Sequence, residues 1–232
     1  NCASLSASRH YSCCNRGCNH LYAPKGGIIV QEHIITFSKE EKEKLEIYSS
    51  LLKNWQKKFN LVSSASLIDI WERHFMDSAQ LYSLLPKKKK GAVVYDIGSG
   101  AGFPGMVLAI MGRKDMVLCE SSTKKCKFLE EIKRQTQTEV IIDNIRAERL
   151  PSHTATAVIA RAVTSLKELL NLTAPLIKEK GPCIFPKGAN WKKELILAES
   201  FFNIEYDLVK SMTSRESNIF VIHSIEKKNG IK

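Results

Sequence analysis

The sequence predicts an α/β protein with a mostly parallel, twisted β-sheet, helices on both faces of the sheet and a helical extension before it. Three observations support this prediction. From Ala92 onward, short apolar segments rich in β-branched residues alternate with longer segments of helical periodicity. A loop with four glycines follows the first apolar segment. Before Ala92, apolar residues recur at intervals of three and four, as on amphipathic helices. Strands that alternate with helices form a parallel sheet covered on both faces.

The sequence predicts two amphipathic helices in the extension before the sheet. Ser38 and Glu41 form a capping-box pattern at the start of the first helix. Its apolar stripe consists of Leu45, Tyr48, Leu52, Trp55 and Phe59. A second helix is expected over residues 66–85, with His74 on its apolar face. The sequence PKKKKG at 86–91 predicts the end of that helix and a solvated linker.

The sheet itself is predicted from strand-like segments. They lie at residues 92–97, 116–120, 139–143, 156–163, 183–188, 203–209 and 218–226. The helical segments between them lie at residues 104–111, 123–135, 165–179 and 191–202. The last two strand-like segments follow each other closely, so we expect them to form an antiparallel edge. In sheets of this kind, ligands bind beyond the carboxyl ends of the strands.

Length and charge limit the possible functions. With 232 residues, the chain suits one domain with an appendage. Its net charge of +11, from 35 basic and 24 acidic residues, favours a polyanionic partner, nucleic acid before anionic membrane. No apolar segment approaches the roughly 18 residues that a membrane span needs. We therefore expect a soluble, cytoplasmic protein that is monomeric and has no membrane partner.

The first 31 residues differ from the rest of the chain. They contain no acidic residue, show no periodicity and begin without Met. They predict an unstructured leader or a gene-start artefact, with a cleaved transit-like segment as the alternative. Residues 32–86 are then expected to form a helical cap, and residues 87–232 the sheet domain.

The cysteines divide into two groups. Cys119, Cys126 and Cys183 lie in apolar or helical patterns and are expected to be reduced thiols of a cytosolic protein. The N-terminal group of possible metal ligands consists of Cys2, Cys13, Cys14, Cys18, His10 and His20. No paired C-x-x-C spacing supports a metal site there, and no metal is predicted.

The glycine-rich loop, YDIGSGAGFPG, indicates the kind of ligand. A phosphate-binding P-loop needs a lysine after its last glycine, and none follows here. The dinucleotide fingerprint needs a third glycine where Phe103 stands. The loop instead has the order Asp96-x-Gly98-x-Gly100-x-Gly102, which is typical of methyltransferases that use S-adenosylmethionine. That ligand has no pyrophosphate, so the loop need only let its methionine and ribose lie against bare backbone.

An acidic residue supports the same cofactor. Glu120 stands at the end of the second strand-like segment, about twenty residues beyond the glycines. A carboxylate at this place can accept hydrogen bonds from both ribose hydroxyls. Loop, acid, spacing and strand order together predict a Rossmann-like class I S-adenosylmethionine-dependent methyltransferase.

The segment DIGSGAGFPGMVLAI carries a more specific signal, because generic methyltransferases lack its Phe-Pro-Gly. This segment resembles the signature of the RsmG (GidB) family, the guanine-N7 methyltransferases of bacterial small-subunit ribosomal RNA. The other similar segments are NLVS, WERHFMDS, CESSTKKCKFLEE, RAERLP, ARAVTSLKELL and PKGANWKKEL. The resemblance covers roughly residues 40–226.

The resemblance implies roles for individual residues. Ala147 and Glu148 correspond to a pair beside the adenine, and Lys187 with Gly188 corresponds to the RNA entrance. The expected cofactor-binding residues are Gly98, Gly100, Gly102, Phe103, Glu120, Ala147, Glu148 and Arg161.

Three residues are expected to be catalytic. Arg161 corresponds to an arginine that faces cofactor and substrate, and His74 and Asp77 lie in the RHFMDS motif near the active-site cleft. The alternative for Arg161 is a surface ion pair at a strand end, and that for His74 is a buried structural histidine.

The resemblance implies methyl transfer from S-adenosylmethionine to N7 of a guanine in small-subunit (16S) ribosomal RNA, free or in a ribosomal particle. Guanine N7 has a lone pair and no proton, so alignment suffices and no general base is needed. A cytosine-C5 enzyme would need a thiolate, but Cys183, which follows Pro182, is better explained as a buried, inert thiol. The alternatives are another RNA substrate, a non-catalytic RNA-binding relative, and an NAD-linked oxidoreductase, which Phe103 disfavours.

Overall fold

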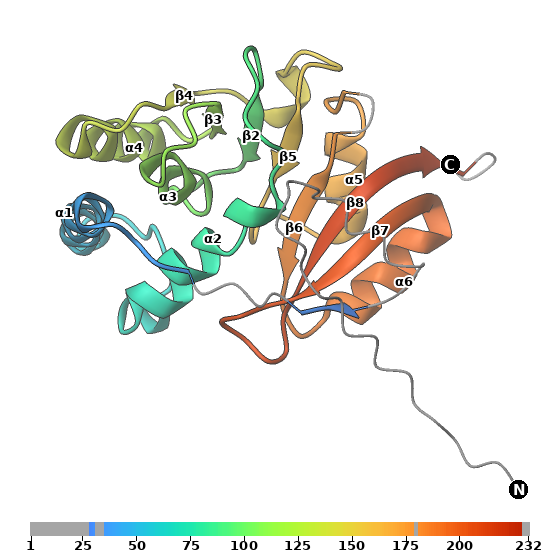
Figure 1. The fold of residues 1–232 in the computed structure, drawn as a ribbon, viewed down its shortest axis with the longest axis horizontal. Helices are drawn as coiled ribbons and strands as arrows, with labels where there is room; N and C mark the ends of the chain where they lie inside the picture. Colours follow the sequence, from blue (N-terminus) through green and yellow to red (C-terminus); the bar gives the residue numbers. More distant parts are fainter. Residues whose placement is uncertain (1–27, 31–34, 179–180, 229–232) are drawn as a thin grey trace, which may run out of the picture.

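A computed structural model describes residues 28–30, 35–178 and 181–228. The described residues form an eight-stranded sheet with the strand order β1-β7-β8-β6-β5-β2-β3-β4 (Figure 1). Its strands are β1 (Ile28–Ile29), β2 (Val94–Ile97), β3 (Met116–Cys119), β4 (Ile141–Asp143), β5 (Ala157–Ile159), β6 (Cys183–Lys187), β7 (Phe202–Lys210) and β8 (Asn218–Lys227).

The sheet is mostly parallel, as predicted. Strands β4, β3, β2, β5 and β6 pair in parallel in that spatial order, and β8 is antiparallel to both β6 and β7. The carboxyl ends of the five parallel strands therefore meet along one edge, where ligands bind in such sheets.

The prediction of an antiparallel edge needs a correction. The two C-terminal strands do pair antiparallel, but β1 adds to the outer side of β7 in parallel, with Ile28 opposite Leu208 and Ile29 opposite Val209. A strand so short and so distant in sequence gives no periodic signal, since two residues cannot show alternation. Because β1 falls inside the expected leader of residues 1–31, that leader would have to end before Ile28. Residues 1–27, with their cysteines and histidines, lie outside the described residues.

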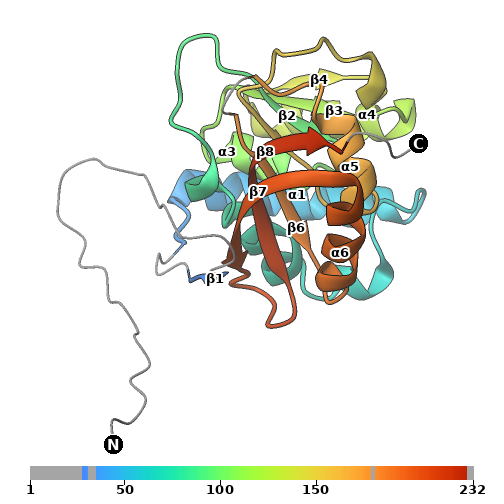
Figure 2. The same cartoon turned by 90° about the vertical axis from the view of Figure 1, so that its right-hand side faces the viewer.

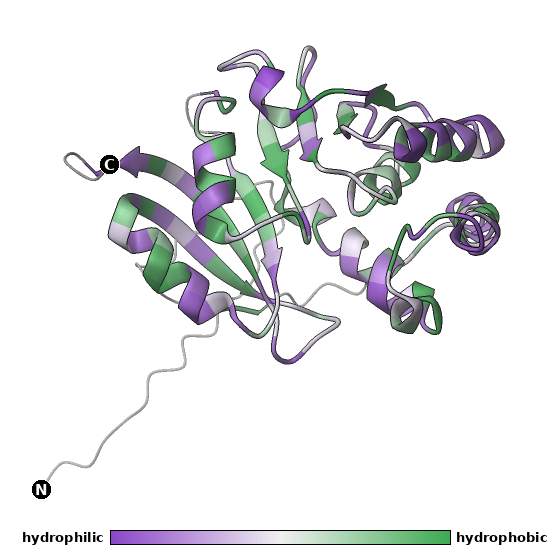
Figure 3. Ribbon diagram, turned by 180° about the vertical axis from the view of Figure 1, so that it is seen from behind, coloured by the Kyte–Doolittle hydropathy of each residue, from purple (hydrophilic) through white to green (hydrophobic). Residues whose placement is uncertain are grey.

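Helices cover both faces of the sheet (Figure 2). The main helices are α1 (Lys39–Gln56), α3 (Gly105–Ile110), α4 (Thr123–Thr136), α5 (Leu166–Thr173) and α6 (Trp191–Phe201). One hydrophobic core joins α1, α3 and α4 to one face, and a second joins α5 and α6 to the other. Every residue of the central strands β2, β3 and β5 is buried, which is typical of a sheet covered on both faces. Figure 3 shows that these strands contain mostly apolar residues. None of the helices within the described residues is long and apolar enough to cross a bilayer.

The first predicted helix is confirmed as α1. Ser38 caps it through its hydroxyl oxygen, which accepts from the amide of Glu41 at 3.2 Å, and the Glu41 carboxylate accepts from the amide of Ser38 at 2.7 Å. Leu45, Tyr48 and Leu52 are fully buried against the sheet domain. This apolar stripe fixes α1 beside α3 and α4.

The second predicted helix is not continuous. Residues 64–84 form a series of short turns: η1 (Ser64–Leu67), the π-helical turn η2 (Trp71–Met76), α2 (Asp77–Ala79) and η3 (Tyr82–Leu84). Periodicity could not predict this, because the apolar positions also suit a regular helix. The widened turn η2 coincides with a contact from another part of the chain, since the carbonyl of Arg73 accepts a hydrogen bond from Arg161 at 3.1 Å. π-Helical turns are frequent at functional sites.

Candidate active site

Three strand ends bring predicted residues together, and a fourth adds Asn144, which the sequence did not single out. The glycine-rich loop follows β2, Glu120 follows β3, Asn144 follows β4 and Arg161 follows β5. The side-chain amide of Asn144 donates to the carbonyl of Glu120 at 2.9 Å, which ties two of these ends to each other. The site therefore lies at the carboxyl edge of the sheet, as the strand pattern predicts.

Glu120 faces the glycine-rich loop. Its carboxylate is buried and accepts hydrogen bonds from the amides of Gly100, at 2.9 Å, and Ser122, at 2.7 Å. An ionised carboxylate can accept about four hydrogen bonds, so about half of its capacity is left. This remaining capacity fits the expected pair of ribose hydroxyls.

The glycines of the loop serve different purposes. At Gly102 (φ +97°) a Cβ atom would lie 2.5 Å from the hydroxyl of Tyr48, so this glycine lets α1 pack against the loop. At Gly100 (φ +58°) the nearest atom to such a Cβ is the carbonyl oxygen of Gly98, at 3.7 Å. Space beside the backbone is therefore open at Gly100, where a ligand could lie, and closed by the core at Gly102.

The segment after β5 packs onto the same loop. A Cβ atom on Gly98 would lie 2.9 Å from the Val163 side chain, so the missing side chain of Gly98 lets this segment approach. The bend continues at Ala162, which has a φ of +54°. The exit of β5 and the glycine-rich loop thus form one packed unit.

Arg161 is held by residues 73–77 of the helical segment before the sheet. Its Nη1 donates to Asp77 Oδ2 at 2.6 Å, and its Nη2 donates to His74 Nδ1 at 2.9 Å. The side chain of Arg161 is 14% exposed and that of Asp77 is 18% exposed. Arg161 thus forms an ion pair, but this pair is largely buried and not at the surface as in the alternative. Its partner is Asp77, and His74 is hydrogen-bonded to the same guanidinium.

Phe103 joins this cluster to the glycine-rich loop. The ring of His74 stacks on Phe103 with centroids 4.5 Å apart, and Tyr48 stacks on Phe103 at 5.2 Å. The guanidinium of Arg161 lies 5.2 Å from the centroid of the same ring, within cation–π distance. The hydroxyl of Tyr48 donates to the carbonyl of Ala101. Sequence analysis placed Tyr48 in an apolar stripe only, and its site contacts had no signal in the helical period.

Burial controls the charge of two groups near the loop. Burial, assisted by the positive charge of Arg161, lowers the pKa of His74 to about 4, so its imidazole is neutral at pH 7. Because Nδ1 accepts from Arg161, Nε2 carries the proton, and this buried Nε2 has no hydrogen-bond partner among the described residues. Burial also raises the pKa of Asp96 to about 7, while its Oδ2 accepts from the amide of Gly105 at 3.0 Å.

We expect His74→Asn to change how stability depends on pH. The unfolded chain protonates His74 below about pH 6.5 and the folded chain only below about pH 4, so the stability linked to this group is lost as pH falls between these values. Asp96 acts with the opposite sign between pH 3.8 and about 7, because the folded chain retains that proton longer. Asparagine keeps an acceptor for Arg161 but does not titrate. The unfolding free energy of the His74→Asn variant, minus that of the parent chain, should therefore rise by up to about 3 kcal/mol as the pH falls from 7 to 4.

Urea unfolding of both chains at several pH values measures this difference. Asp96 is present in both chains, so its contribution cancels. Parallel curves for the two chains across this pH range would contradict a buried, neutral His74.

Other predicted residues lie outside the cluster. Ala147 and Glu148 form part of η4 (Ala147–Arg149) after β4, and they take no part in the contacts of Arg161 or Glu120. Lys187, expected at the RNA entrance, is instead buried, and donates to the carbonyl of Thr164 at 2.7 Å and pairs with Glu194 at 2.8 Å. Both residues lie in the segment PKGANWKKEL, but the resemblance implied no role for Glu194.

The thiol of Cys183 is buried, as expected, and burial raises its pKa to about 12. It is therefore a protonated, structural thiol at neutral pH.

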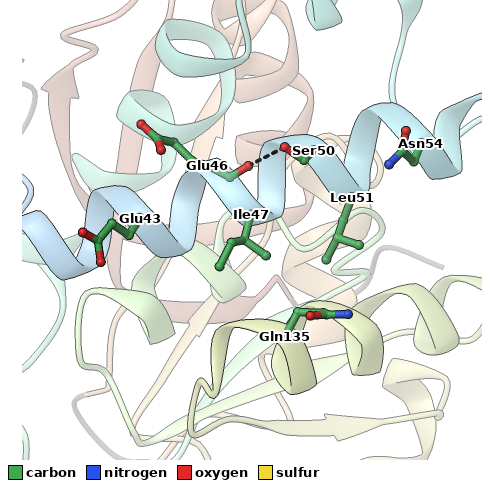
Figure 4. A pocket seen from close by; sticks show the side chains of 7 residues that line it. All are labelled: Glu43, Glu46, Ile47, Ser50, Leu51, Asn54 and Gln135. Atoms are coloured by element: carbon green, nitrogen blue, oxygen red, sulfur yellow. Dashed lines mark hydrogen bonds between the residues drawn. The ribbon is translucent and has the colours of Figure 1, made fainter.

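Two pockets lie beside α1 and the residues that follow it. The larger, of about 520 Å³, runs along α1 (Figure 4) and is lined by Glu43, Glu46, Ile47, Ser50, Leu51, Asn54 and, from α4, Gln135. It contains none of the predicted site residues. The smaller, of about 180 Å³, is lined by Phe59, Asn60, Leu61, Ser122, Lys124 and Lys125. It adjoins Glu120, since the amide of Ser122 donates to that carboxylate.

Two further residues, neither of them predicted from the sequence, contact Asp77. Its Oδ1 accepts from Thr213 Oγ1 at 2.7 Å and from Gln80 Nε2 at 2.9 Å. Gln80 follows Asp77 by three residues and would be expected on the same helical face. Thr213 lies in the turn between β7 and β8, and only the folded structure brings it to this site.

Known sequences are similar to this chain over most of its length. A sequence model of the family described as "rRNA small subunit methyltransferase G" matches residues 41–221. A protein of that name from Paramagnetospirillum magneticum is 40% identical over 193 residues, which cover 83% of this chain and 92% of the relative. Another of the same name, from Rhodospirillum centenum, is 42% identical over 176 residues, covering 76% of this chain and 81% of the relative.

Solved structures share the fold at low sequence identity. An S-adenosylmethionine-dependent methyltransferase from Aquifex aeolicus has a TM-score of 0.53 and 13% identity, covering 76% of this chain and 98% of that protein. An S-adenosylmethionine-dependent O-methyltransferase from Thermotoga maritima has a TM-score of 0.53 and 14% identity, covering 78% and 73% of the two chains. The Rossmann-like class I methyltransferase fold predicted from the sequence is confirmed.

Proposed function

The chain belongs to the rRNA small subunit methyltransferase G family, and on that premise we propose that it transfers the methyl group of S-adenosylmethionine to N7 of a guanine in small-subunit ribosomal RNA. The observation that carries the cofactor assignment is the pairing of Gly100 with Glu120. Open space beside the Gly100 backbone and a carboxylate with unused acceptor capacity lie next to each other. Together they suit a ligand with a ribose and no pyrophosphate.

The residues of the site suit a reaction that needs alignment rather than proton transfer. S-adenosylmethionine, when bound, supplies a methyl group on a positively charged sulfur. The N7 lone pair of guanine forms the new bond to that methyl carbon as the bond from carbon to sulfur breaks, and no proton moves. Neutral His74 adds no second positive charge beside Arg161. The stacked rings of His74, Phe103 and Tyr48 give the site rigid walls, and rigid positioning can lower the barrier of such a reaction by several kcal/mol.

The substrate guanine must be unpaired or turned outward. In an A-form helix, N7 lies in the deep and narrow major groove, where side chains do not reach it. The net charge of +11 supports binding to the RNA backbone. We further propose that the chain acts as a cytoplasmic monomer and that the helical segment before the sheet forms a cap, because His74 and Asp77 of that segment close over Arg161.

Radiolabelled S-adenosylmethionine tests this function. The full chain is incubated with small ribosomal subunits and with bare rRNA from a strain that lacks this modification, and the labelled base is mapped. We expect label on N7 of one guanine. A transcript that carries 7-deazaguanine, with carbon in place of N7, should accept no label. Label on another atom or another class of RNA would contradict the proposal.

A further inference from the structure

The turn between β7 and β8 reaches into the site from the far end of the chain. Thr213 Oγ1 donates to Asp77 Oδ1 at 2.7 Å, and the amide of Met212 donates to Gln80 Oε1 at 2.9 Å. Gln80 in turn donates to Asp77 Oδ1 at 2.9 Å. Figure 1 shows this turn, at the start of β8, extending to the same side of the sheet as α2. Thr213 therefore holds the carboxylate that pairs with Arg161 directly, and Met212 holds Gln80, which also donates to that carboxylate.

These contacts fix the orientation of Asp77. One of its carboxylate oxygens accepts from Arg161 at 2.6 Å, and the other accepts from Thr213 and Gln80. A carboxylate held at both oxygens cannot rotate without breaking a hydrogen bond. Its position sets that of the Arg161 guanidinium, which holds the His74 ring against Phe103. An unbroken series of contacts thus joins Thr213 to the glycine-rich loop.

The turn is also held by contacts that do not involve Thr213. The amide of Ser211 donates to the carbonyl of Ser217 at 3.3 Å, and β7 and β8 remain paired up to Lys210 and Asn218. The hydroxyl of Ser217 also donates to that of Ser214 at 2.9 Å. Within the turn, Thr213 contacts Ser211, whose hydroxyl oxygen lies 3.3 Å from both the amide and the hydroxyl of Thr213. The shortest contact of the Thr213 hydroxyl, at 2.7 Å, is the one to Asp77, 136 residues away.

We infer that Thr213 is a positioning residue for methyl transfer. It fixes Asp77 so that Arg161 and His74 are aligned when the target base enters, and it contacts neither cofactor nor RNA itself. The inference rests on the proposed function and adds to it an element that the sequence motifs do not contain. It assigns a catalytic purpose to the β7–β8 turn.

The test replaces Thr213 by valine, which has nearly the same shape and no hydroxyl. We expect single-turnover methyl transfer to saturated complexes to fall about tenfold, since small misplacements of aligned groups have effects of this size or larger. The affinity for S-adenosylmethionine and the RNA concentration at half saturation should each change less than twofold. Thr213→Ser restores the donor and should restore most of the rate. Thr154→Val is the matched control, because it removes a hydroxyl that donates to the carbonyl of Pro151 at 2.8 Å, at the opposite end of the sheet.

A double-mutant cycle separates positioning from loss of stability. In an Arg161→Ala background, Thr213→Val should have no further effect on the rate, because the contact that it acts through is gone. Equal effects in both backgrounds, or a rate for Thr213→Val equal to that of the parent chain, would overturn the inference. Inactivity of the parent chain on small-subunit RNA would instead contradict the proposed function, so the two failures are distinguishable.

Discussion

Replacing Arg161 by alanine should lower the single-turnover rate of methyl transfer by about a hundredfold or more, the effect typical of losing one positioned polar group. The guanidinium joins three parts of the site, since it donates to Asp77 and His74 and lies over the ring of Phe103. Without it, His74 Nδ1 loses its donor and the ring is no longer held in one orientation. Rates measured with saturating RNA and cofactor test this expectation.

Two variants serve as controls for Arg161→Ala. Arg161→Lys should restore little, because an ammonium group cannot donate in fixed directions to both Asp77 and His74. Arg113→Ala removes another arginine that is paired with an aspartate, at 2.6 Å from Asp115, and bonded to the carbonyl of Pro86. It should lose stability while the folded fraction keeps its rate. If Arg161→Ala transfers methyl groups at close to the parent rate, the pair with Asp77 is structural only.

Replacing Gly100 by valine should abolish binding of S-adenosylmethionine while the protein stays folded. A side chain at this position would extend into open space beside the Glu120 carboxylate and not into the core. The expected result is no measurable binding by calorimetry at cofactor concentrations that saturate the parent chain. A cooperative unfolding transition should remain.

The backbone strain of this substitution needs its own control. Gly100 has a φ of +58°, which costs a β-branched residue on the order of 1–3 kcal/mol. Gly91 has a φ of +75° and no atom within 4 Å of its Cβ position, so Gly91→Val introduces similar strain away from the loop. Gly91→Val should bind cofactor normally. Normal binding by Gly100→Val as well would show that the loop does not hold the ligand.

The sheet could be predicted from sequence because its strands are short apolar segments separated by helical periods, a local signal. The glycine-rich loop and Glu120 could be predicted for the same reason, since both follow directly from strand ends. The irregular helical turns at residues 64–84 could not, because their apolar spacing also suits a regular helix, and the contact of Arg161 with the carbonyl of Arg73 in η2 comes from a distant part of the chain. Local patterns do not contain information about such distant partners.

The sequence indicated which residues form the candidate site but not which contacts they make with one another. The family resemblance indicated Arg161, His74 and Asp77 as catalytic residues. The structure brings these three residues together. It also shows that Lys187 is buried in an ion pair and that Gly102 serves the packing of Tyr48. A resemblance between sequences cannot distinguish a lysine at a surface from one paired inside, and glycine spacing cannot distinguish a ligand contact from a packing contact.

The pairing of β1 with β7 has a consequence for the order in which the chain folds. Ile28 and Ile29 have their strand partners at Leu208 and Val209, near the other end of the chain. Contacts between such distant residues close a large loop and form slowly. During synthesis, the partner strand emerges from the ribosome only after almost every other element has been made. Strand β1 is therefore among the last strands to join the sheet, and it stays unpaired while the rest of the domain folds.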